Sequence, residues 1–188
     1  MSDAPVEAPY DSIPPYNMQV LLAHHVDRML SNCRQAIEDL TVEELNHFPA
    51  TEANSIGWDI WHVLRTADNV VFFVFDREQP VWLRGGYHER WGLPKVAQGT
   101  GMAGEEARGL RFPAAHELIE YLEGVRAAIV PKVASMTDDE LAQVVMLRPW
   151  GERTKADHLL QTVVAHGADH FGRVILARAL LGKDIFGF

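Results

Sequence analysis

The stretch NSIGWDIWHVLRTADNVVFFVF, residues 54–75, is apolar on most sides and therefore predicts a largely buried helix. Asn54 or Ser55 is a suitable N-cap for it. Its polar residues recur in alternating steps of four and three, so they share one face: Ser55, Asp59, His62, Thr66 and Asn69. Such a stripe either faces solvent or lines an internal polar site.

Three further segments have a helical period of apolar residues, at about 16–40, 113–136 and 154–181. The segments at 16–40 and 113–136 are each followed by the same capping pair, Thr41 with Glu44 and Thr137 with Glu140. The segments DLTVEELNHFP and SMTDDELAQVV thus occupy matching places, and the chain reads as two related helix pairs. We predict an all-α protein without a sheet, built on four long helices.

Residues 78–111 separate the second long helix from the third and contain seven of the 14 glycines but no sustained helical period. A connection of this length allows neighbouring helices of a bundle to run parallel. We expect a long crossover that covers a pocket, with Trp82, Tyr87 and Trp91 exposed on it.

The bulk composition limits the class of protein. The chain has 188 residues, 47% of them hydrophobic, which suits one domain at 16–188 behind a loosely ordered tail at 1–15. A net charge of -9 argues against nucleic acid as a partner. The longest apolar run, 70–75, is too short for a membrane span. A single cysteine, Cys33, sits in the first helix's apolar stripe, which favours a core residue in a cytoplasmic protein.

The histidines suggest a metal site. His166 and His170 in HGADHFG are four residues apart, which stacks two imidazoles on one helical face. With nine histidines in the chain such a pair also arises by chance, and it would then be solvent-facing. His62, on the polar stripe of the buried helix and in the matching position of the other helix pair, offers a third nitrogen. Three neutral imidazoles suit Zn²⁺, Ni²⁺ or Fe²⁺.

From about Tyr16 to Gly182 the chain resembles the DinB-like superfamily of metalloenzymes, whose members include mycothiol- and bacillithiol-dependent transferases and maleylpyruvate isomerase. The resemblance rests on His62 in SIGWDIWHVL and on His166, His170 and Gly172 of a His-x-x-x-His-x-Gly motif. It implies an up-down-down-up four-helix bundle with a long link between helices 2 and 3. It also implies that these three histidines bind a divalent metal.

Other polar residues near the candidate ligands have weaker cases. Asp59 and Asp169 lie within one turn of a ligand, where a carboxylate can orient an imidazole, but acidic residues on helices are usually just solvated. His25 and His158 stay outside the predicted ligand set. The lone Glu44-x-x-His47 lacks the second pair that a di-iron bundle needs, and no His-Glu-x-x-His of a zincin protease occurs.

Three protein ligands leave a coordination position open, which is typical of catalytic sites. The residues and the resemblance together suggest a thiol-dependent S-transferase or isomerase acting on a small electrophile, with a low-molecular-weight thiol as cosubstrate. A metal-dependent hydrolase and a non-catalytic metal- or ligand-binding stress-response protein remain alternatives. The expected partner is a small-molecule substrate, and a homodimer is one option for the assembly.

Overall fold

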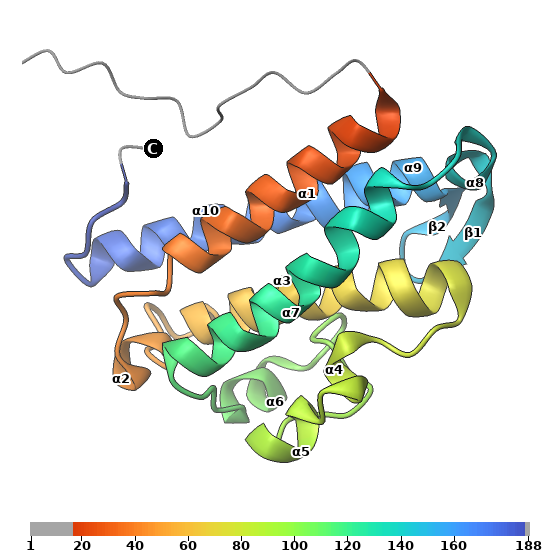
Figure 1. The fold of residues 1–188 in the computed structure, drawn as a ribbon. Helices are drawn as coiled ribbons and strands as arrows, with labels where there is room; N and C mark the ends of the chain where they lie inside the picture. Colours follow the sequence, from red (N-terminus) through yellow and green to blue (C-terminus); the bar gives the residue numbers. More distant parts are fainter. Residues whose placement is uncertain (1–16, 187–188) are drawn as a thin grey trace, which may run out of the picture.

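A computed structural model describes residues 17–186, so the expected tail at 1–15 lies outside the described residues. Four long helical rods dominate it (Figure 1). The first is α1, Met18–Gln35. The second is α3, Ile56–Asp68, continued by the π-helical turn η1, Asn69–Val74. The third is α7, Ala115–Ala134. The fourth joins α9, Lys155–His158, the π-helical segment η2, Leu159–Ala165, and α10, His166–Leu180.

The rods form an up-down-down-up bundle, as predicted. Figure 1 shows α1 and α10 running one way and α3 and α7 the other. α1 packs on α7 and α10 packs on α3, which are the antiparallel pairs. Leucine, isoleucine, valine and tryptophan side chains from all four rods fill the centre, and α3 is buried along its whole length. A polar residue on α3 is therefore held inside the bundle.

The capping pairs begin short helices where the sequence indicates them. Thr41 and Glu44 form a reciprocal capping box at α2, Val42–Leu45, and Thr137 and Glu140 form one at α8, Asp138–Ala142. In each box the hydroxyl and the carboxylate satisfy backbone N–H groups of the first turn. The two boxes fix the chain at the ends of α1 and α7.

The crossover at 78–111 is more ordered and more buried than the sequence indicates. It contains α4, Val81–Arg84, α5, Tyr87–Trp91, and α6, Gly104–Gly109. The expectation of exposed aromatic residues is wrong: Trp82 is fully buried and Tyr87 nearly so, and both rings pack against Tyr121 of α7. The carboxylate of Asp68 on α3 accepts the backbone N–H groups of Val81 and Trp82, both at 2.8 Å. The crossover is thereby fastened to α3.

The expectation of no sheet is also wrong, although the sheet is small. β1, Val144–Leu147, and β2, Gly151–Thr154, form an antiparallel hairpin in which Val144 pairs with Thr154. Strands of four residues are too short to show a clear period of two in the sequence. Gly151, at the start of β2, has φ +88°, a conformation that favours glycine. The hairpin places residues 148–150 beside the start of α10.

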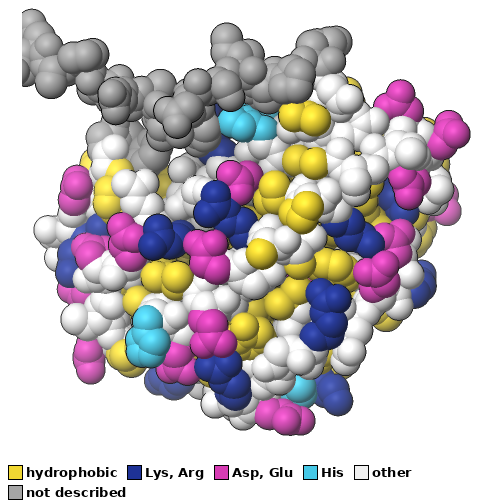
Figure 2. Space-filling view, viewed as in Figure 1, with side chains coloured by type: hydrophobic (Ala, Val, Ile, Leu, Met, Phe, Trp, Pro, Cys, Tyr) yellow, Lys and Arg dark blue, Asp and Glu magenta, His cyan; other side chains and the backbone are white. Residues whose placement is uncertain are grey.

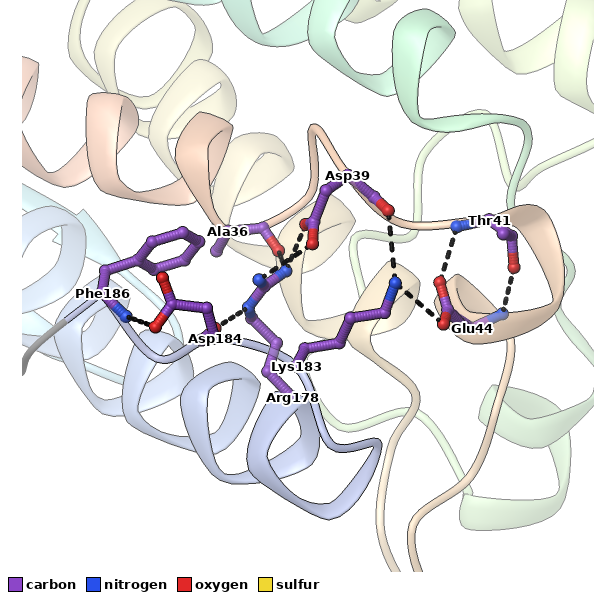
Figure 3. Close-up of polar contacts among 8 residues, drawn as sticks. All are labelled: Ala36, Asp39, Thr41, Glu44, Arg178, Lys183, Asp184 and Phe186. Carbon is purple, nitrogen blue, oxygen red and sulfur yellow. Dashed lines mark hydrogen bonds and ion pairs between the residues drawn. The ribbon is translucent and has the colours of Figure 1, made fainter.

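The C-terminal end of α10 is fastened to the loop after α1 (Figure 3). The fully buried guanidinium of Arg178 donates to both carboxylate oxygens of Asp39, at 2.6 and 3.2 Å, and to the Ala36 carbonyl at 2.8 Å. Lys183 lies between Glu44 and the Asp39 carbonyl. A bidentate guanidinium–carboxylate pair is directional, so it fixes the position of α10 relative to α1. Within residues 17–186, each helix is too short or too polar to cross a bilayer.

Candidate metal centre

The structure brings His62, His166 and His170 together between α3 and the first two turns of α10. The Nε2 atom of His166 lies 3.2 Å from that of His62 and 3.1 Å from that of His170. One ligand atom from each residue lies within 4.8 Å of the others. His62 and His170 are almost completely buried and His166 is half-buried. The three rings thus point their outer nitrogens at one place.

The hydrogen-bond partners of Nδ1 determine the tautomers of His62 and His170. Nδ1 of His170 lies 2.7 Å from the Asp59 carboxylate, and Nδ1 of His62 faces the backbone carbonyl of Gln98. A carbonyl or carboxylate oxygen accepts a hydrogen bond, so each Nδ1 carries the hydrogen and each Nε2 presents a lone pair. His166 has one Nε2 and can donate to only one of these neighbours. At least two lone pairs therefore face each other, an arrangement that suits a cation.

The spacing also fits a small divalent ion. Two nitrogens bound at 2.0–2.1 Å to one tetrahedral zinc ion are about 3.3 Å apart, close to the separations observed here. Neutral imidazole is a ligand for zinc, nickel and iron alike. The donor set fits a divalent metal without distinguishing among these three.

A glycine lets the crossover approach the candidate centre closely. Gly99 has φ +101°, and a Cβ atom there would lie 2.8 Å from both Nδ1 of His62 and Cζ2 of Trp58. Contacts below 3.0 Å force a displacement of the neighbouring atoms. Only glycine lets the crossover reach the ring of His62 while the Gln98 carbonyl accepts its hydrogen bond.

Two tryptophans surround the histidine rings. Trp58, one turn before His62 on α3, stacks on its ring with the centroids 4.8 Å apart. Trp150, carried by the β1–β2 turn, packs edge-on against His166 at 5.4 Å. These apolar surfaces shield the imidazoles from water.

Burial keeps two of the candidate ligands unprotonated. The pKa of His62 is lowered to about 4, mainly by desolvation, with smaller contributions from the neighbouring imidazoles and Arg173 and an opposing one from the Gln98 carbonyl. Desolvation also lowers the pKa of His166 to about 4, followed by the effect of His170. Both rings are therefore neutral near pH 7, which is the form that binds metal.

The remaining candidates from the sequence lie elsewhere. Asp169 is exposed, whereas Asp59, the other acidic candidate, contacts the candidate ligand His170. His158 is fully buried, and its ring nitrogens contact Thr162 Oγ1 and the Val145 carbonyl. His25, on α1, lines a separate cavity between α1 and the fourth rod. Cys33 is fully buried, as expected for a core residue, and this burial raises the pKa of its thiol to about 12.

Sequence reasoning missed Trp58, Trp150, Gln98 and Arg173 as neighbours of the histidines. Trp58 had a readable signal, since it stands four residues before His62 on the same helix. Gln98 acts through its backbone, and Trp150 depends on a hairpin that the sequence does not show. Arg173 stands three residues after His170 on the same helix, and this spacing already indicates that the two side chains share a helical face.

Comparisons with known proteins show the family and the fold of this chain. The family model of the DinB superfamily matches residues 25–174. A conserved protein from Enterococcus faecalis has a similar crystal structure, with a TM-score of 0.77, 22% identity, and coverage of 92% of this chain and 100% of that one. YfiT from Bacillus subtilis, a probable metal-dependent hydrolase with an unusual four-helix bundle topology, has a TM-score of 0.62, 11% identity and 94% coverage of both chains. No curated protein matches the chain.

Proposed function

The chain belongs to the DinB superfamily, and on that premise we propose that it is a metal-dependent enzyme whose ion is held by His62, His166 and His170. The observation that carries this proposal is the convergence of three Nε2 atoms. Two of them, in His62 and His170, belong to rings whose Nδ1 atoms contact oxygen acceptors outside the cluster. We propose one divalent ion per chain, with zinc, nickel and iron as candidates.

A bound divalent ion with three neutral ligands and an open position supplies Lewis-acid activation of a small nucleophile. The chain's own residues prepare the place. Asp59 and the Gln98 carbonyl hold two imidazoles in the required orientation, and burial keeps His62 and His166 neutral. Trp58 and Trp150 restrict access of water.

The nucleophile comes from solution. Cys33, the one cysteine, is fully buried with a raised pKa, so no protein thiol serves this site. A low-molecular-weight thiol is the leading candidate, which makes the protein an S-transferase or isomerase acting on a small electrophile in the cytoplasm. In the transfer, the thiol loses its proton to solvent and its sulfur bonds to the electrophilic carbon. The leaving group departs with the electron pair of the broken bond.

Hydrolysis is the second candidate, and the description of YfiT as a probable metal-dependent hydrolase favours it. Water then takes the place of the thiol as nucleophile. A third candidate, metal or ligand binding without turnover, uses the same three histidines.

One series of assays separates these functions. Protein purified without added metal is analysed for its elements, and metal-loaded protein is tested on electrophiles with and without mycothiol, bacillithiol, glutathione or coenzyme A. We expect about one ion per chain and turnover that needs a thiol. His170→Ala should abolish both, while His47→Ala, an exposed histidine, should retain both.

The other outcomes identify the alternatives. Turnover that needs metal but no thiol would indicate a hydrolase. Metal binding without turnover under all conditions would indicate a binding protein. Full metal retention in His62→Ala and His166→Ala would contradict the proposed centre itself.

A further inference from the structure

The face of α10 that carries the histidines continues into a cavity. His166, His170, Arg173, Ala177 and Leu180 follow one another in steps of four and three, so they form a single stripe along α10. The stripe runs from the candidate metal centre toward the C-terminal end of α10. Because α10 packs antiparallel on α3, that end lies near the start of α3 (Figure 1). Groups bound along it lie in line with the histidines.

A cavity of about 320 Å³ opens beside this stripe, between α10 and the loop at 49–54. Asp59, whose carboxylate contacts His170, is part of its lining. Leu176 and Leu180 also line it and are 62% and 64% exposed. The volume is in the range of small-molecule pockets, and exposed leucines gain from being covered by an apolar group.

Two polar side chains in the cavity can donate hydrogen bonds. Arg173 is exposed, and among residues 17–186 no hydrogen bond or ion pair engages its guanidinium. Asn54 lines the opposite, loop side of the cavity.

The acidic residues of the cavity do not neutralise Arg173. Asp59 is buried and bonded to His170, and no ion pair joins it to Arg173. Glu52 is 87% exposed and lies 3.7 Å from Arg108 instead. A guanidinium that has no ion-pair partner among residues 17–186 and lies at the edge of an apolar cavity offers a site for an anion.

We propose that Arg173, with Asn54, binds the carboxylate of the substrate, and that the substrate's apolar body lies on Leu176 and Leu180. The planar guanidinium matches a carboxylate through two parallel N–H···O bonds. The substrate class is accordingly a small electrophile that carries one carboxylate and an apolar chain. This inference rests on the proposed function, because it assigns the cavity to the substrate of the metal centre.

The test measures binding without turnover. Calorimetric titrations of octanoate, octanamide and octyl phosphate are made on both metal-free and zinc-loaded protein. Octanoate should bind both forms at least tenfold more tightly than octanamide, and Arg173→Gln should weaken octanoate binding roughly tenfold or more in both. Arg34→Gln, an exposed arginine on α1 paired with Glu38 and Glu123, is the matched control and should change it less than twofold.

A second variant tests the apolar part of the site. Leu180→Asp places a negative charge on an exposed wall of the cavity, so it should weaken octanoate binding without unfolding the protein. Circular dichroism of each variant verifies folding.

Three results would overturn the inference. The first is octanoate affinity that is unchanged in Arg173→Gln. The second is octanoate binding that disappears with the metal, which would mean that the ion itself coordinates the carboxylate. The third is octyl phosphate binding tenfold more tightly than octanoate. None of these measurements involves turnover, so an inert protein with Arg173-dependent binding would contradict only the proposed function, and turnover without such binding would contradict only this inference.

Discussion

His170 donates a hydrogen bond from Nδ1 to Oδ1 of Asp59 over 2.7 Å, and both side chains are buried. Asp59 stands on α3 and His170 on α10, so this one contact joins the two helices that carry the candidate ligands. A carboxylate in this position orients the imidazole and raises its basicity as a metal ligand. Asp59 is therefore a positioning residue of the site.

The first prediction concerns that carboxylate. Asp59→Asn keeps the size of the side chain but removes its charge, so metal affinity should fall roughly 10- to 100-fold. Competition with a chromophoric chelator measures the affinity. Asp169→Asn is the matched control, because Asp169 neighbours His170 in sequence but is exposed. It should bind metal within about twofold of the wild-type protein. Equal losses in the two variants would contradict a specific role for Asp59.

The second prediction concerns the close approach of the crossover. Gly99→Ala adds a Cβ atom 2.8 Å from Nδ1 of His62, so it should displace the Gln98 carbonyl and weaken metal binding about tenfold or more. Gly101→Ala is the control for backbone strain, because Gly101 also has positive φ, +72°, but nothing lies within 4 Å of its added Cβ.

Both alanine variants should lose some stability, of the order of 1 kcal/mol from backbone strain alone. Only Gly99→Ala should also lose metal affinity. Thermal unfolding and metal titration on the same samples separate the two effects, and normal metal binding by Gly99→Ala would show that the crossover does not position His62.

The four long rods were predictable because apolar residues recur with a helical period in each of their sequences. The apolar stripe of α1 and the all-round apolar surface of α3 state which faces are buried, and the capping boxes at Thr41 and Thr137 state where short helices start. The burial of Trp82 was not predictable, since it depends on Tyr121 of another helix. The hairpin was missed because its strands span only four residues each.

The same distinction holds at the candidate metal centre. The i, i+4 spacing of His166 and His170 is a local property, and the structure brings His62 to them. Local spacing could not choose between Asp59 and Asp169, because both lie within a turn of a candidate ligand. The packing of α3 on α10 decides it. The Gln98 carbonyl carries no sequence signal, since every residue has a carbonyl.

The third prediction is an absence of DNA affinity. The net charge is -9, and on the face shown in Figure 2 lysine and arginine side chains are interspersed with aspartate and glutamate. Non-specific binding needs a surface that neutralises several phosphates at once. Fluorescence anisotropy with a random labelled duplex near physiological ionic strength should show no binding. Binding that weakens steeply with added salt would refute this expectation.

The last prediction concerns stability and pH in the metal-free protein. Burial lowers the pKa of His62 and His166 to about 4, whereas a histidine in the unfolded chain titrates near 6.5. Between these values the unfolded state binds more protons than the folded state, so the free energy of unfolding should rise with pH from about 4 to 6.5. Above that window both states have neutral rings, and these two residues add no further pH dependence.

Urea unfolding of metal-free protein at intervals from pH 4 to pH 8 measures this slope. Paired carboxylates such as Asp39, whose pKa is lowered by Arg178, lose their contribution mainly below this window, so they do not mimic the effect. His62→Ala should flatten the rise between pH 4 and 6.5, because it removes one group that gains a proton on unfolding. His47→Ala, at an exposed position, should leave the rise unchanged. An identical slope in the wild-type protein and His62→Ala would mean that His62 is not held neutral in the folded protein.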